Sequence, residues 1–163
     1  MAKQNVIPPG TSQQAFSSRA ERLHQRATAY SDDQKAAQLR SLLGRAAALC
    51  RLTVGALSQP SDMWPEVQHV AKSIETAQAN AEDAIALHEV LVGNSPLAFD
   101  TTIDRAVGVL ATLDAWLWAE EWERMPDGQV MCASLAAAAE VLDECAELAS
   151  VAHQEGSQRR AAH

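Results

Sequence analysis

The side chains best suited to chemistry in this sequence are carboxylates and a histidine that fall on apolar stretches. Asp114 and Glu121, seven residues apart, lie within one apolar segment, and His88 falls on the apolar side of another. A carboxylate buried among apolar residues must find a partner or take up a proton. The sequence therefore predicts an interior polar cluster of Asp114, Glu121 and His88. Two readings stay open, a satisfied structural hydrogen bond and a ligand-binding or proton-transfer site.

Other signatures of catalysis or cofactor binding are missing from the sequence. The five histidines form no His-x-x-x-His pair, and no glycine-rich phosphate motif is present. Cys50, Cys132 and Cys145 have no CxxC spacing, and spacing places no base beside any of them. We therefore expect a non-enzymatic protein, with no catalytic residue, metal ligand or cofactor.

Tryptophans are concentrated in one acidic stretch. Three of the four tryptophans lie within seven residues and are interleaved with glutamates. Tryptophan is enriched at binding hot spots because it joins a large apolar surface to one hydrogen-bond donor. The cluster either fills gaps left by alanines in the core or forms an interaction surface. If the cluster forms an interaction surface, it extends over the acidic residues that follow. The expected partner interface then consists of Trp116, Trp118, Trp122, Glu120, Glu123, Glu140, Asp143, Glu144 and Glu147.

Charge is divided unevenly along the chain. Residues 1–72 hold nine Lys and Arg against five Asp and Glu, whereas residues 73–163 hold four against sixteen. Such asymmetry indicates halves that attract each other or surfaces for different partners. Arg19, Arg22 and Arg26 form a basic stripe that could neutralise phosphates, but the net charge of −8 argues against nucleic-acid binding. An acidic surface that imitates nucleic acid is an alternative.

Composition favours an all-α fold. Alanine, the best helix former, dominates the apolar residues, and the chain has only two Phe and one Tyr. Its 163 residues suit one domain. No apolar run approaches the ~18 residues of a membrane span, no secretory leader is apparent, and the cysteines are odd in number. We therefore expect a soluble cytoplasmic protein that does not enter a membrane.

Apolar spacing predicts an antiparallel bundle of about five helices, a four-helix core plus an N-terminal helix. Residues 1–14 should be a flexible arm, residues 15–153 one bundle domain, and residues 154–163 a disordered tail. The first helix, from about Ser12 to Tyr30, has a narrow apolar seam at spacings of four, three, four and three: Phe16, Ala20, Leu23, Ala27 and Tyr30.

Turn and cap patterns delimit the remaining helices. Ser31 and Gln34 form a capping box that opens the second helix, which should end before Ser58. Asp62 is expected to cap the third, and the last two are expected at about 100–124 and 129–153. Short connections place sequential helices antiparallel.

The sequence thus favours a protein-interaction module, such as an adaptor, an inhibitor or immunity-type protein, or an assembly subunit. Its expected partner is another protein with a basic surface, or a second copy in a homo-oligomer. The alternatives are a nucleic-acid-associated or nucleic-acid-mimicking regulator and a small-ligand-binding bundle that uses the interior cluster.

Overall fold

The computed structural model describes residues 29–92, 97–119 and 127–161, and side chains within 29–89, 101–117 and 127–150. These residues form four α-helices and the short 3-10 helix η1 (Ser61–Met63), without a strand among them. The helices are α2 (Asp32–Leu57), α3 (Val67–Val92), α4 (Leu97–Ala119) and α5 (Gly128–Ala161). The all-α prediction is confirmed, but the described helices number four rather than about five. The predicted arm and nearly all of the predicted first helix lie outside the described residues.

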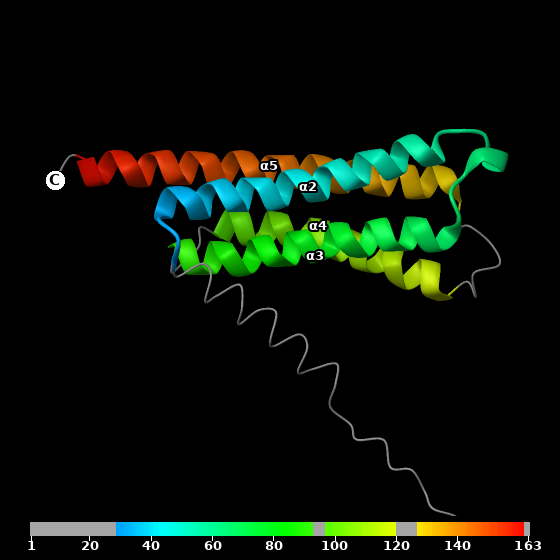
Figure 1. The fold of residues 1–163 in the computed structure, drawn as a ribbon, viewed down its shortest axis with the longest axis horizontal. Coiled ribbons are helices and arrows are strands. Elements are labelled where there is room, and N and C mark those ends of the chain that lie inside the picture. The colour runs from blue at the N-terminus through cyan, green and yellow to red at the C-terminus, as the bar shows by residue number, and fades with distance from the viewer. Residues whose placement is uncertain (1–28, 93–96, 120–126, 162–163) are drawn as a thin grey trace, which may run out of the picture.

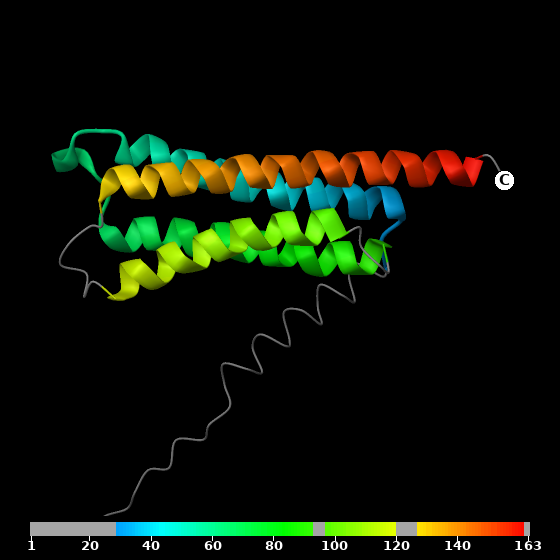
Figure 2. The same ribbon diagram turned by 180° about the vertical axis from the view of Figure 1, so that it is seen from behind.

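The four helices pack as an antiparallel bundle in which each helix has two principal neighbours. The main contacts join α2 to α3, α3 to α4, α4 to α5 and α5 back to α2. Figures 1 and 2 show the four helices side by side, with α5 extending past its neighbours at its C-terminal end. The α2–α3 and α4–α5 connections therefore lie at one end of the bundle, hereafter the two-connection end.

The start of α2 agrees with the sequence. The Ser31 backbone N–H donates to Oε1 of Gln34 at 2.9 Å, and the Gln34 backbone N–H donates to the Ser31 hydroxyl at 3.3 Å. This reciprocal pair satisfies two N–H groups that the first helical turn leaves without intrahelical partners. The helix ends at Leu57, before Ser58, as predicted.

The start of α3 and the end of α5 differ from the sequence expectation. Asp62 does not cap α3, because it lies within η1 and α3 begins only at Val67. Trp64 is extended with ψ 143°, the conformation that the following Pro65 favours, so a helix cannot run through it. At the other end, α5 continues to Ala161 through most of the predicted tail. Those residues lack proline, and Glu155 and Arg159 have the i, i+4 spacing that supports a helix.

The core consists of leucines and isoleucines set among alanines. Its largest fully buried side chains include Leu43 of α2, Ile74 of α3, Leu110 of α4 and Leu142 of α5. Alanines on every helix fill the positions between them, so the helix axes can approach closely. Truncating one such leucine to alanine is expected to cost about 2–5 kcal/mol of unfolding free energy.

Candidate functional site

The acidic face of α5 is the clearest part of the predicted interface that the structure describes. Glu140, Glu144 and Glu147 are exposed within two helical turns, and Asp143 lies at the edge of the same face, toward α2. We call these four residues the acidic α5 face. All four were predicted as interface residues, and the helix brings their carboxylates together because it repeats every 3.6 residues.

Basic side chains of α2 lie along one edge of this face. Arg51 forms an ion pair with Asp143, and that hydrogen bond and charge raise the pKa of the Arg51 guanidinium, with Glu140 adding a smaller contribution. Arg40 donates to the Ser150 hydroxyl at 3.1 Å, also across α2 and α5. The expected attraction between the basic and acidic parts of the chain is therefore present at the α2–α5 contact.

The tryptophan part of the predicted interface is mostly not described. Trp122, Glu120 and Glu123 lie outside the described residues, as does the side chain of Trp118. Trp116 is half-buried and packs against the hydrophobic core. The position of Trp116 agrees with the hypothesis that the tryptophans fill gaps in the core. Helix α4 packs against both α3 and α5, so it needs a wide apolar arc.

The predicted interior cluster is not assembled. His88 is only 2% exposed, and one carboxylate oxygen of Asp114 is buried; both residues take part in polar, ionic or ring interactions. His88 lies about 6 Å before the end of α3, whereas Asp114 lies about 26 Å after the start of α4. Because these two ends are joined by a short connection, the residues are about 20 Å apart along the bundle. Glu121 lies outside the described residues.

The thiols and the potential metal ligands do not form a reactive centre in the described part of the chain. Cys50 and Cys145 are buried, and burial raises the pKa of their thiols to about 11 and about 12. Such thiols stay protonated at neutral pH, so they are poor nucleophiles. No group of three or more His, Cys, Asp or Glu side chains that could hold a metal ion occurs among the described residues. None of the described helices is long and apolar enough to cross a membrane.

Trp64, the tryptophan outside the predicted cluster, organises the two-connection end. Its indole N–H donates to the Gln59 carbonyl at 2.7 Å, and its ring lies directly over Gly128 at the start of α5. The ring is one wall of an open groove of about 710 Å³ that Asp127 and Cys132 also line. Sequence reasoning missed this contact because it joins residues 64 positions apart.

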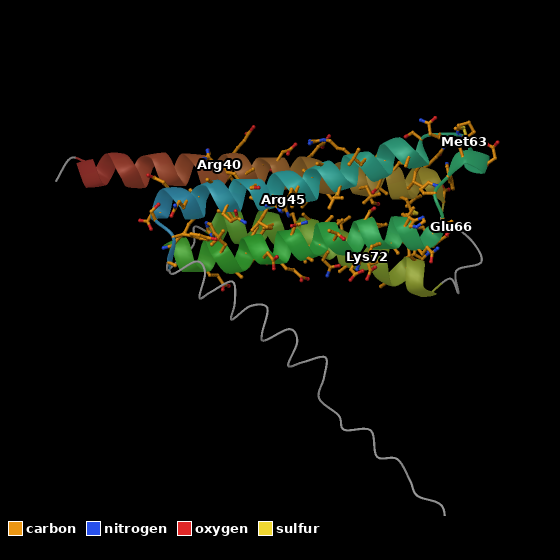
Figure 3. The ribbon with its side chains drawn as sticks, viewed as in Figure 1. Arg40, Arg45, Met63, Glu66 and Lys72 are labelled. Atoms are coloured by element: carbon orange, nitrogen blue, oxygen red, sulfur yellow. The ribbon has the colours of Figure 1, made fainter. Side chains whose placement is uncertain are left out.

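A second, apolar groove lies between α2 and α3 near the same end. It has a volume of about 230 Å³ and is lined by Leu49, Leu52, Thr53, Ala56, Pro65, His69, Val70 and Ser73. Leu52 is 71% exposed, and Met63, in the adjoining connection, is 65% exposed. Figure 3 shows Met63 and Glu66 at this end of the molecule, with Arg45 farther along α2. We call this feature the α2–α3 groove. The sequence analysis does not predict a site at Leu52, although this leucine lies outside the apolar face that α2 turns toward the core.

Comparison of the chain with models of protein families, with curated proteins and with solved structures finds no match in any of the three.

Proposed function

We propose that this chain is a non-enzymatic protein-interaction module that presents the acidic α5 face to a basic partner protein. The supporting observation is that Glu140, Glu144 and Glu147 project from exposed positions on one side of α5. Asp143, on the same face, already has a cation, Arg51. The remaining three carboxylates are therefore placed to attract and orient basic side chains of another protein.

The acidic α5 face opposes the stability of its own helix. Its four residues make two like-charge pairs at i, i+4 and two at i, i+3, and each such pair costs a helix about 0.2–0.5 kcal/mol. The preceding residues, Ala136 to Ala139, are strong helix formers that offset this repulsion. A basic partner would replace the repulsion with attraction, so binding would relieve a cost that the free helix bears.

A charge-neutralising variant tests the proposal. Glu140, Glu144 and Glu147 are changed together to glutamine, which keeps their shape and removes three charges. The matched control changes three exposed acids elsewhere, Asp62→Asn, Glu89→Gln and Asp104→Asn.

Both triple variants and the unmodified protein are used to capture partners from a lysate of the native host, and the affinity of the captured protein is then measured at two salt concentrations. We expect the α5 variant to bind about 10-fold or more weakly, with a smaller salt dependence, and the control to bind normally. Equal binding by the two variants, or no specific partner for the unmodified chain, would refute the proposal.

The same experiment distinguishes the other candidate functions. A nucleic-acid-mimicking regulator would use this face too, and duplex DNA or RNA would then displace the captured partner. A homo-oligomer would give twice the monomer mass or more in light scattering, and this mass would be lower for the α5 variant. The small-ligand alternative requires His88 and Asp114 to lie together, and no geometric observation favours it.

We propose a cytoplasmic location for this protein, since Cys50, Cys132 and Cys145 are free.

A further inference from the structure

The exposed side of α2 has a charge opposite to that of the acidic α5 face. From Gln34 to Leu57, α2 contains four cations and no acid, whereas α5 from Gly128 to Ser150 contains four acids and no cation. Six exposed residues of α2, spaced three or four apart, form a ridge within an arc of about 80°. We call them the basic α2 ridge: Ala37, Arg40, Gly44, Ala48, Arg51 and Gly55.

The basic α2 ridge and the acidic α5 face lie side by side on one outer surface. Arg51 forms its ion pair with Asp143 there, and these two side chains are 56% and 44% exposed. Arg40 reaches across the same boundary to Ser150. Helices α2 and α5 run next to each other along this surface (Figures 1 and 2). The surface therefore carries a basic strip and a parallel acidic strip.

The basic α2 ridge contains two glycines that the single chain does not require. Gly44 and Gly55 lie within α2, and a Cβ atom on either would meet no atom within 4 Å. A glycine inside a helix costs about 0.5–1 kcal/mol relative to alanine, and it permits close approach of another backbone. None of the described residues makes that approach. A second helix on this ridge could therefore pack at the short end of the usual interaxial distance, about 8 Å.

We propose that the basic α2 ridge and the acidic α5 face form one self-complementary interface, on which a second copy of this chain docks about a two-fold axis parallel to the helices. Such an axis places α2 of each copy on α5 of the other. A two-fold axis across the helices would instead set arginines against arginines and carboxylates against carboxylates, so charge selects the parallel axis. The inference rests on the proposed function, because it names the basic partner of the acidic α5 face.

The parallel axis also sets which residues meet, because rotation about it leaves every residue at its own level along the bundle. Three contacts within one chain align the two helices: Arg40 with Ser150, Arg51 with Asp143, and Val54 with Cys132. By this alignment Arg51 lies within about 2 Å of the level of Glu140, and Arg40 within about 5 Å of the level of Glu147. In the dimer, Arg51 of one copy thus faces Glu140 of the other, and Arg40 faces Glu147.

The facing groups have capacity for these contacts. Glu140 and Glu147 belong to none of the ion pairs within the described part of the chain. A guanidinium has five N–H donors, and Arg51 uses one of its nitrogens for Asp143. Both arginines can therefore bind a carboxylate of the second copy while they keep their contacts to α5 of their own chain.

The size of the surface indicates a reversible dimer. From Ala37 to Gly55 the ridge is about 27 Å long, and the two helices are about 20 Å wide, so two copies bury roughly 1,100 Å² in total. Weak and transient complexes bury less than about 1,200 Å². We therefore expect a dimer that dissociates on dilution.

Charge reversal on each strip tests the proposal. One variant carries Glu140→Arg and Glu147→Arg, and the other carries Arg40→Glu and Arg51→Glu. The matched control, Glu82→Arg with Glu89→Arg, reverses two exposed acids at the same seven-residue spacing on α3. Molar mass is measured by light scattering over a range of protein concentration, for each variant alone and for an equimolar mixture of the first two.

We expect the unmodified chain and the α3 control to approach twice the monomer mass as concentration rises. Each reversed variant alone should associate about 10-fold or more weakly, because like charges then face each other. The mixture should recover the affinity of the unmodified chain, since the arginines of one variant meet the glutamates of the other at both halves of the interface.

A steric variant tests the close approach independently of charge. Gly44→Leu adds bulk to the basic α2 ridge at a point where no atom of the chain lies within 4 Å, so the monomer should keep its fold. Gly108→Leu makes the same change at an exposed position on α4. We expect Gly44→Leu to weaken association about 10-fold or more and Gly108→Leu to leave it unchanged.

Three results would overturn the proposal: a chain that stays monomeric at every concentration, reversed variants that associate as well as the unmodified chain, or a mixture that stays monomeric. The capture experiment decides the proposed function separately. A monomeric chain that captures a basic protein through its α5 carboxylates would overturn the second copy as the partner and support the proposed function.

Discussion

Gly128→Ala is expected to destabilise this protein, although glycine-to-alanine changes in helices normally stabilise. A Cβ atom on residue 128 would lie 2.8 Å from Cζ2 of the Trp64 ring and closer still to Cη2. Real Cβ atoms essentially never approach so closely, so the ring has to move. That movement strains or breaks the hydrogen bond from the Trp64 indole to the Gln59 carbonyl.

The expected size of the effect follows from three contributions. Loss of the indole hydrogen bond costs about 0.5–1.5 kcal/mol, and overpacking costs about 1–3 kcal/mol. The higher helix propensity of alanine relative to glycine stabilises the variant by at most about 1 kcal/mol, and by less at the first residue of α5. Together these contributions lower the unfolding free energy by about 0.5–4.5 kcal/mol, which lowers Tm by roughly 2–14 °C for a chain of this size.

The chain supplies its own controls for this experiment. Gly44, Gly55 and Gly108 lie within helices, and a Cβ atom on any of them would meet no atom within 4 Å. Each change to alanine should therefore raise the unfolding free energy by about 0.5–1 kcal/mol.

Urea and thermal unfolding, followed by circular dichroism at 222 nm, measure all four variants. In a Trp64→Ala background, Gly128→Ala should no longer destabilise. Stabilisation by Gly128→Ala in the unmodified protein, equal to that at Gly44, would show that the contact with Trp64 does not constrain this end of the bundle.

Three further predictions concern buried groups and surface charge. His88→Ala and Asp114→Ala should add within about 0.5 kcal/mol in a double-mutant cycle, because residues about 20 Å apart do not share contacts; a larger coupling energy would restore the interior cluster. Because burial raises the pKa of Cys50 to about 11, its stabilising contribution is complete below the pKa of the unfolded thiol, near 9, and is lost as pH rises from there through about 11. Cys50→Ala should therefore flatten the decline of unfolding free energy between pH 9 and 11, and an unchanged decline would contradict this account. The triple glutamine variant of the acidic α5 face should unfold at a slightly higher temperature in low salt, and the gain should shrink as salt screens the repulsion; a lower Tm would mean that the carboxylates stabilise the free helix.

Local sequence signals predicted the local features of this fold. The all-α class, the Ser31–Gln34 capping box and the end of α2 follow from alanine content, cap chemistry and apolar spacing within a few residues. The start of α3 lies later than an Asp62 cap predicts, because Pro65 keeps Trp64 extended. The end of α5 lies beyond the predicted residue 153, because the polar residues that follow can continue a helix.

The candidate sites were predictable only where they lie on a single helix. Glu140, Asp143, Glu144 and Glu147 share one face of α5, as helical periodicity alone predicts. His88 and Asp114 lie at different levels along the bundle, which burial on two separate helices cannot predict. Those levels depend on where each helix begins and ends and on which ends are connected.

The sequence by itself thus determined the helices, their apolar sides and the acidic α5 face, because each depends on residues within a few turns of one another. The tertiary structure alone decided that Arg51 meets Asp143, that Trp64 covers Gly128, and that α2 and α3 leave an apolar groove beside Leu52. Each of these features joins segments distant in the chain. Their formation depends on the antiparallel packing of whole helices, and no local pattern specifies that arrangement.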